Sequence, residues 1–68
     1  MLDKNKLCSK FKYYGLTMEH VAKILGINVA TLSRKINGSS DFTRNEIEML
    51  RMRLELTATE LQAIFFAA

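Results

Sequence analysis

The chain of 68 residues contains no proline, no tryptophan, one cysteine and one histidine. Cys8 cannot form an internal disulfide, which favours a reducing, cytoplasmic location. Cys8 and His20 together fall short of the four ligands of a structural zinc site, so we expect no bound metal. No apolar run is long enough to span a bilayer, and the first residues lack the apolar core of a signal peptide. These absences argue against a secreted, a membrane-spanning and a metal-binding protein.

The residue constellations that support catalysis are also missing. The three glycines, Gly15, Gly26 and Gly38, lie too far apart to form a phosphate-binding loop. Cys8 and His20 would need a third group to orient the histidine as a base, and nothing near them in the sequence supplies one. We therefore expect a binding protein without a cofactor, and not an enzyme.

The composition is that of a small globular domain, with 49% hydrophobic and 25% charged residues and a net charge of +3. An isoelectric point near 9.3 fits a polyanionic partner without requiring one. The basic residues gather in the first half of the chain, while residues 55–68 carry two glutamates and no cation. We expect one domain over residues 1–68, with Lys4 and Lys6 on a solvated face.

Capping residues and glycines mark the boundaries of five helices. Glycine is favoured just after a helix, so the three glycines predict three helix ends. Helix starts are predicted at four residues that can cap a backbone N–H and lie between apolar neighbours: Thr17, Asn28, Thr43 and Thr57. Thr43 with Glu46 and Thr57 with Glu60 are also spaced as capping boxes. The sequence predicts an all-α fold of five short helices near residues 3–14, 17–25, 28–37, 43–54 and 57–66.

Apolar residues at helical spacing form the expected core. Its members are Leu7, Phe11, Leu16, Val21, Ala22, Leu25, Ile27, Leu32, Ile36, Phe42, Ile47, Leu50, Leu54, Leu56 and Leu61.

The segment over residues 17–38 carries the strongest functional signal. Gly26 can adopt a left-handed conformation that ends one helix, and Asn28 can cap the next helix two residues later. Ala22 is small enough to let the two helices cross closely. The second helix carries short side chains and one long cation, Arg34, so its backbone could lie deep in the major groove of DNA. The alternative is an ordinary helical hairpin of a bundle, but the turn and capping pattern favours DNA binding.

The pattern LTxxxVAxxLGIxxxTLSRxING over residues 16–38 resembles the Cro and repressor type of helix-turn-helix regulators in phages and bacteria. The run NGSSDFTRNEI over residues 37–47 and the tail Ile64-Phe65-Phe66 are similar to a narrower group, the small phage and prophage regulators of Gram-positive bacteria. The resemblance covers nearly the whole chain from Leu7 onward. It implies a Cro/repressor-like helix-turn-helix domain that regulates transcription.

The resemblance also implies which residues contact DNA. Base contacts are expected from the second helix of the pair, at Asn28, Val29, Ala30, Ser33 and Arg34. Phosphate contacts are expected from both helices and the following loop, at Thr17, Met18, Thr31, Lys35, Asn37, Ser39 and Ser40. Related regulators often have a glutamine at the position of Met18, and its side chain can bind a phosphate. A methionine side chain cannot, so only the backbone N–H of Met18 remains available for a phosphate. Base readout by hydrogen bonds then depends on Asn28, Ser33 and Arg34, because Val29 and Ala30 offer only apolar contacts.

We expect a homodimer on double-stranded DNA, because one recognition helix reads few base pairs and two adjacent half-sites add affinity and specificity. The apolar C-terminus is the predicted dimer contact, at Ile64, Phe65 and Phe66. The two phenylalanine rings point to different sides of a helix and cannot both be buried in so small a core. The alternative is that they close the core against Phe11.

A second class of function also fits the sequence. The recognition helix has few polar side chains and the tail is very apolar. The chain could therefore be a protein-interaction module that keeps the helix-turn-helix fold and modulates another repressor, such as another phage regulator.

Overall fold

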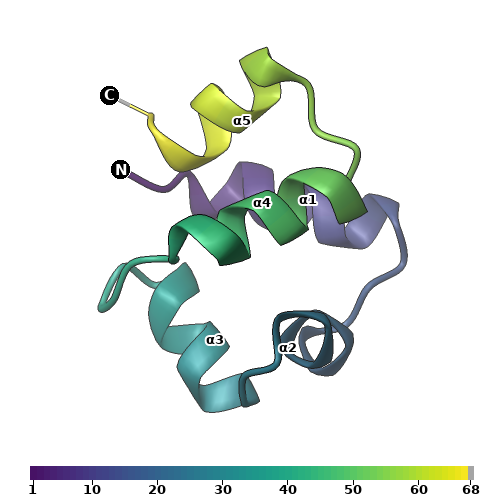
Figure 1. Ribbon diagram of the computed structural model, residues 1–68, viewed down its shortest axis with the longest axis vertical. Helices are drawn as coiled ribbons and strands as arrows, with labels where there is room; N and C mark the ends of the chain where they lie inside the picture. Colours follow the sequence, from purple (N-terminus) through teal and green to yellow (C-terminus); the bar gives the residue numbers. More distant parts are fainter. Residues whose placement is uncertain (68) are drawn as a thin grey trace.

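The helices follow one another through short turns and wrap around a single core. The computed structural model describes residues 1–67, and these form five α-helices and no β-strand. The helices are α1 (Lys4–Tyr13), α2 (Met18–Leu25), α3 (Val29–Ile36), α4 (Arg44–Arg53) and α5 (Ala58–Phe65). In Figure 1, α2 and α3 lie at one end of the molecule and α5 at the other, with α1 and α4 between them. The prediction of an all-α fold with five short helices is confirmed.

The predicted capping residues start the helices. Thr17, Asn28, Thr43 and Thr57 are the N-caps of α2 to α5, and in each case the side chain accepts the backbone N–H three residues later. The two predicted capping boxes of α4 and α5 are present. A third box was missed, since the Nδ1 atom of His20 accepts the backbone N–H of Thr17 at 3.3 Å. The predicted ranges are slightly too long because they include the caps, which lie outside the helices.

The end of α4 carries no glycine signal. Glu55 has a φ of 51° and ends α4 in the left-handed region, where a residue with a Cβ is strained. Its carboxylate accepts a hydrogen bond from the Tyr14 hydroxyl at 3.3 Å, which ties the turn before α5 to the end of α1. Sequence reasoning found the end of α4 only from the capping residue that starts α5.

The core is formed by all five helices. Leu7, Val21, Leu32, Leu50 and Leu54 are fully buried at its centre. Most of the predicted core is buried, but five members are only half-buried and pack around its rim: Leu16, Ile27, Phe42, Ile47 and Leu61. Leu16, Ile27 and Phe42 lie in the segments between helices, and Ile47 and Leu61 lie near the start of α4 and α5.

The two ends of the described chain, residues 1–3 and 64–67, lie side by side (Figure 1). The Asp3 N–H donates to the Ile64 carbonyl at 2.6 Å, and the Ala67 N–H donates to the Met1 carbonyl at 2.9 Å. These bonds fold the end of α5 against the start of α1.

This arrangement corrects the prediction for the C-terminal dimer contacts. Ile64 is 2% exposed and Phe65 is 7% exposed, so both belong to the core of one subunit. The Phe65 ring packs edge to face against Phe42, with ring centroids 5.7 Å apart. Phe66 alone of the three remains available, with 55% of its surface exposed. Phe65 points inward because the termini pair, which is a long-range contact that helical spacing does not reveal.

Candidate nucleic-acid interface

A tight turn fixes the angle between α2 and α3. Gly26 lies in the left-handed region at φ 71°, and the Ile27 N–H donates to the Ala22 carbonyl at 3.0 Å. Asn28 then caps α3, because its Oδ1 atom accepts the Thr31 N–H at 2.7 Å. Only three residues therefore separate the two helices.

One face of α3 is buried and the opposite face is open. Leu32 and Ile36 point into the core with exposed fractions of 0% and 5%. The predicted base contacts lie on the other face, where Asn28, Val29, Ala30 and Arg34 are exposed and Ser33 is half-buried. The structure therefore places the five predicted base-contact residues together on one outward-facing helix surface.

Local hydrogen bonds orient the polar groups of this surface. The Arg34 guanidinium donates to the Thr31 hydroxyl at 3.2 Å, which directs it along the helix. The Asn28 side-chain oxygen accepts the capping bond from the Thr31 N–H, which holds the side chain at the start of α3. The capping bond uses one of the two lone pairs of this oxygen, and the amide NH₂ group can donate to an acceptor on a base or a phosphate.

The structure corrects the prediction that Lys35 contacts a phosphate. Its side chain is only 11% exposed, and its Nζ atom lies 2.8 Å from Oε1 of Glu46 and 3.0 Å from the Asp41 carbonyl. The amine is therefore used inside the protein, where it links the last turn of α3 to the start of α4. No sequence pattern predicts this pairing, because Glu46 is identified from the sequence only as part of a capping box.

Glu46 is a buried charge that is fully compensated. Burial alone would raise the pKa of its carboxyl group, but hydrogen bonds from Lys35 and from the Thr43 backbone N–H lower the pKa below its ordinary value. The Oε1 atom accepts both bonds, each at 2.8 Å. The ion pair and the helix cap therefore share one carboxylate oxygen.

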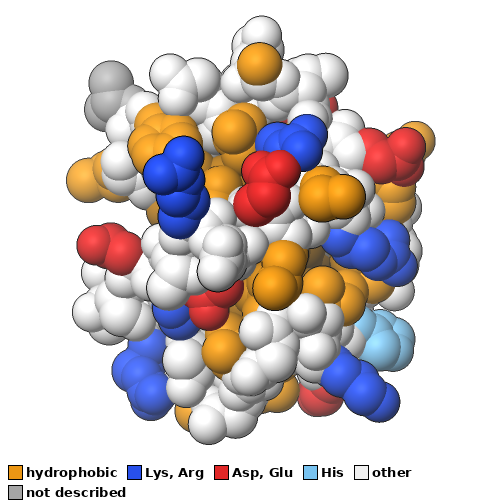
Figure 2. All heavy atoms as spheres, in the orientation of Figure 1, with side chains coloured by type: hydrophobic (Ala, Val, Ile, Leu, Met, Phe, Trp, Pro, Cys, Tyr) orange, Lys and Arg blue, Asp and Glu red, His pale blue; other side chains and the backbone are white. Residues whose placement is uncertain are grey.

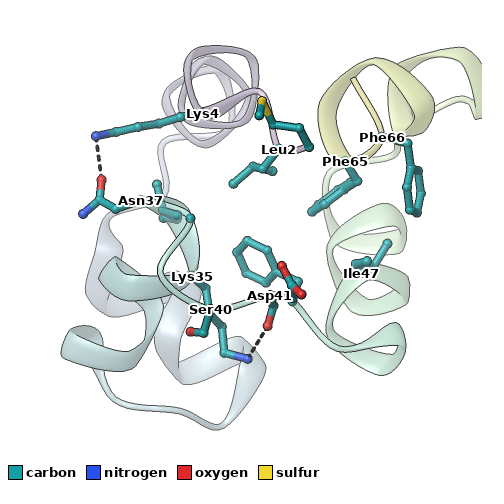
Figure 3. A pocket seen from close by; sticks show the side chains of 13 residues that line it. Leu2, Lys4, Lys35, Asn37, Ser40, Asp41, Ile47, Phe65 and Phe66 are labelled. Carbon is teal, nitrogen blue, oxygen red and sulfur yellow. Dashed lines mark hydrogen bonds between the residues drawn. The ribbon is translucent and has the colours of Figure 1, made fainter. Parts of the chain in front are cut away.

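Lys4 is the residue near this surface that sequence reasoning missed. It lies on an exposed face, as expected, and its Nζ atom also donates to Oδ1 of Asn37 at 2.8 Å (Figure 3). The bond holds the Asn37 carbonyl and leaves the amide group of Asn37 directed to its other side, 3.4 Å from the Ser33 hydroxyl. Lys4 and Asn37 lie 33 positions apart in the sequence, so no local pattern predicts their contact.

The other predicted phosphate contacts lie at the two ends of the α2–α3 pair. Ser39 and Ser40 are exposed in the loop after α3. Thr17 is exposed at the start of α2, while the side chain of Met18 packs against the core, leaving its backbone as the polar group near the surface. Thr31 is half-buried and its hydroxyl already accepts a bond from Arg34.

The charges on this part of the molecule are mixed. Figure 2 shows Lys and Arg side chains projecting at the ends of the face that contains α2 and α3, with acidic side chains between them. Four ion pairs are present among residues 1–67, and Arg34 takes part in none of them. Arg34 is therefore a cation on the exposed face of α3 with no carboxylate partner in the described part of the chain.

Within residues 1–67, no helix is both long and apolar enough to cross a membrane, and no three His, Cys, Asp or Glu side chains are grouped as a metal site. Comparisons of the chain with protein-family models, with curated proteins and with solved structures found no match.

Proposed function

We propose that the protein is a sequence-specific, DNA-binding transcriptional regulator of the Cro/repressor helix-turn-helix type, which reads the major groove with α3 and acts as a homodimer. The observation that supports this proposal is the outer face of α3. This face is exposed, and it carries Arg34, which forms no ion pair within residues 1–67. The tight turn at Gly26 holds this helix across α2.

The shape and chemistry of α3 suit a major groove. A groove about 12 Å wide admits an α-helix, and short side chains let the helix backbone approach the bases. Arg34 can donate two hydrogen bonds to guanine, and the Asn28 amide can donate to a base acceptor. Val29, which is 39% exposed, and Ala30 can contact thymine methyl groups.

Groups that can donate to phosphates flank α3 on both sides. Asn37, held by Lys4, lies at its C-terminal end beside Ser39 and Ser40. The backbone N–H groups at the start of α2 lie before the turn, where Thr17 and Met18 are the candidates. This distribution would fix the orientation of α3 on the duplex, because phosphate contacts set the register of a DNA-binding protein.

We test the proposal by titrating the protein into fluorescent DNA taken from directly upstream of its own gene, at several salt concentrations. With about four to six phosphates neutralised, the logarithm of the binding constant should fall with the logarithm of the salt concentration at a slope between about −3 and −6. A scrambled duplex of the same composition should bind more weakly. A binding constant that is independent of salt would count against the proposal.

The Arg34→Ala variant should lose about 1–3 kcal/mol of binding free energy on the preferred DNA site and little on scrambled DNA. The reason is that Arg34 is the longest donor on the exposed face of α3. Arg53→Ala, which removes an exposed arginine from α4, is the matched control and should leave both affinities unchanged. Equal losses on both DNAs would assign Arg34 to a phosphate instead of a base.

A second function is favoured by one observation. Met49 and Met52 are 44% and 66% exposed on α4, and flexible, polarizable methionines suit a protein-binding surface. In this alternative the chain modulates another regulator through its helix-turn-helix fold. A stable complex with a regulator encoded nearby, together with no binding to duplex DNA, would favour this function.

A further inference from the structure

A hollow opens between the two ends of the chain and the loop after α3. Its volume is about 840 Å³. Apolar side chains form much of its wall: Leu2, Ile36, Phe42, Ile47, Phe65 and Phe66. Figure 3 shows the ring of Phe65 at this space, with Phe66 next to it at the edge, and the Phe42 ring that packs against Phe65 also lines the hollow. The hollow thus places unfilled apolar space beside an exposed aromatic ring.

Three charged side chains line the hollow: Lys35, which is paired with Glu46, and Lys4 and Asp41, which are not paired with each other. Lys4 meets the neutral Asn37 side chain, and no ion pair joins it to a carboxylate within residues 1–67. The Asp41 carboxylate is likewise in none of the four ion pairs of the described chain. Figure 3 shows Lys4 and Asp41 on different sides of the hollow.

These features make the surface complementary to itself. A two-fold symmetric interface is formed by the same surface patch of both subunits. The patch must therefore carry both an aromatic ring and the cavity that receives the partner's ring, and both a positive and a negative charge. Phe66 and the hollow supply the first pair, and Lys4 and Asp41 supply the second. The area is also continuous with Asn37 and Ser40, which line the hollow and belong to the proposed phosphate contacts.

We infer that the hollow is the dimer interface, and that Phe66 of each copy inserts into the hollow of the other copy while Lys4 faces Asp41 across the two-fold axis. The inference rests on the proposed homodimeric regulator and specifies how its two copies meet. Two copies joined here would carry their phosphate-binding loops beside the axis and their α3 helices on either side of it. The two recognition helices would then reach adjacent half-sites.

Sedimentation equilibrium without DNA tests the interface independently of the proposed function. Wild-type protein should dimerise at tens of micromolar, and Phe66→Glu should raise the dimer dissociation constant at least about 30-fold, as for removal of a central aromatic contact. Met52→Glu is the matched control, because Met52 is more exposed than Phe66 and does not line the hollow. Its dissociation constant should stay near that of the wild type. Circular dichroism should show the same helix content in all three proteins.

Two variants with reversed charges provide a second test of the interface. Lys4→Glu alone and Asp41→Lys alone should each weaken dimerisation about tenfold, because like charges then face each other in both symmetric contacts. An equimolar mixture of the two variants should restore it to near the wild-type value, since both contacts of the mixed dimer are attractive. Failure of the mixture to recover would overturn the inference.

The two proposals fail in distinguishable ways. A wild-type protein that stays monomeric at 100 micromolar (about a hundredfold above a micromolar constant) and still binds DNA with sequence preference overturns the interface and leaves DNA binding in place. A dimer that dissociates in Phe66→Glu but never binds DNA supports the interface and overturns the regulator.

Discussion

Replacement of Glu46 by alanine should lower the free energy of unfolding by about 3 kcal/mol, because it leaves the buried Lys35 amine without its carboxylate. The side chains of Lys35 and Glu46 are 11% and 10% exposed, so little water reaches the amine to replace the lost partner. The same change removes the capping box of α4, since the Thr43 N–H also donates to Glu46. For a domain of this size the loss is a large part of the total stability. Chemical denaturation followed by circular dichroism measures it.

Glu60→Ala is the matched control for burial. Glu60 completes the capping box of α5 and pairs with Lys10, just as Glu46 completes that of α4 and pairs with Lys35. The side chains of Lys10 and Glu60 are 29% and 35% exposed, so water can reach the lysine that Glu60→Ala leaves behind. We therefore expect a clearly smaller loss for Glu60→Ala. Equal losses in the two variants would show that the cap, and not the buried ion pair, accounts for the effect.

The same pair also contributes to the pH dependence of stability. Because hydrogen bonds lower the pKa of Glu46 in the folded chain, its stabilising contribution is complete above the ordinary value of 4.5 and is lost as the pH falls through the lowered value. Glu46→Gln should therefore lose less stability than the wild type on acidification below about pH 4.5. A pair of unfolding curves at neutral and acidic pH measures this difference.

Gly26→Val should be among the most damaging single changes outside the core, with a loss of about 2 kcal/mol in the free energy of unfolding. The residue has a φ of 71°, a conformation that a β-branched side chain resists. No heavy atom lies within 4 Å of the place that a Cβ would take, so the strain comes from the backbone and not from a clash. If the chain relaxes by changing this φ, the angle between α2 and α3 changes and DNA binding is lost as well.

Gly26→Asn tests whether the effect of Gly26→Val comes from the left-handed backbone conformation or from the mere presence of a side chain. Asparagine enters the left-handed region more readily than valine, so this variant should keep most of the stability and the DNA affinity. Thermal melting and the DNA titration described above give both readouts. A Gly26→Val protein that melts and binds DNA like the wild type would show that the α2–α3 turn tolerates another conformation.

The local parts of the structure could be predicted from the sequence. The helix caps are formed by hydrogen bonds that reach only three residues along the chain, so a short stretch of sequence is enough to predict them. They are the caps at Thr17, Asn28, Thr43 and Thr57. Gly26 likewise ends α2 by its own backbone freedom. The buried face of α3 follows from the spacing of its apolar residues.

The parts that could not be predicted depend on contacts between distant segments. The sequence predicts that Lys35 is an exposed cation. In the fold the start of α4 lies beside Lys35, and its side chain is buried against Glu46. Lys4 meets Asn37 for the same reason. Phe65 is buried because the two termini pair, which leaves Phe66 as the exposed ring. Long-range packing thus decides which charged and aromatic residues remain on the surface.

Selection of duplexes from a pool of random DNA by the purified full chain tests most directly whether the protein reads base sequence. We predict enrichment of a two-fold symmetric site whose half-sites are centred about 10 base pairs apart, because two α3 helices must enter major grooves on the same side of the duplex. The Arg34→Ala protein should enrich the same site with a relaxed preference at one position in each half-site. A wild-type pool that remains random after repeated rounds would contradict the account.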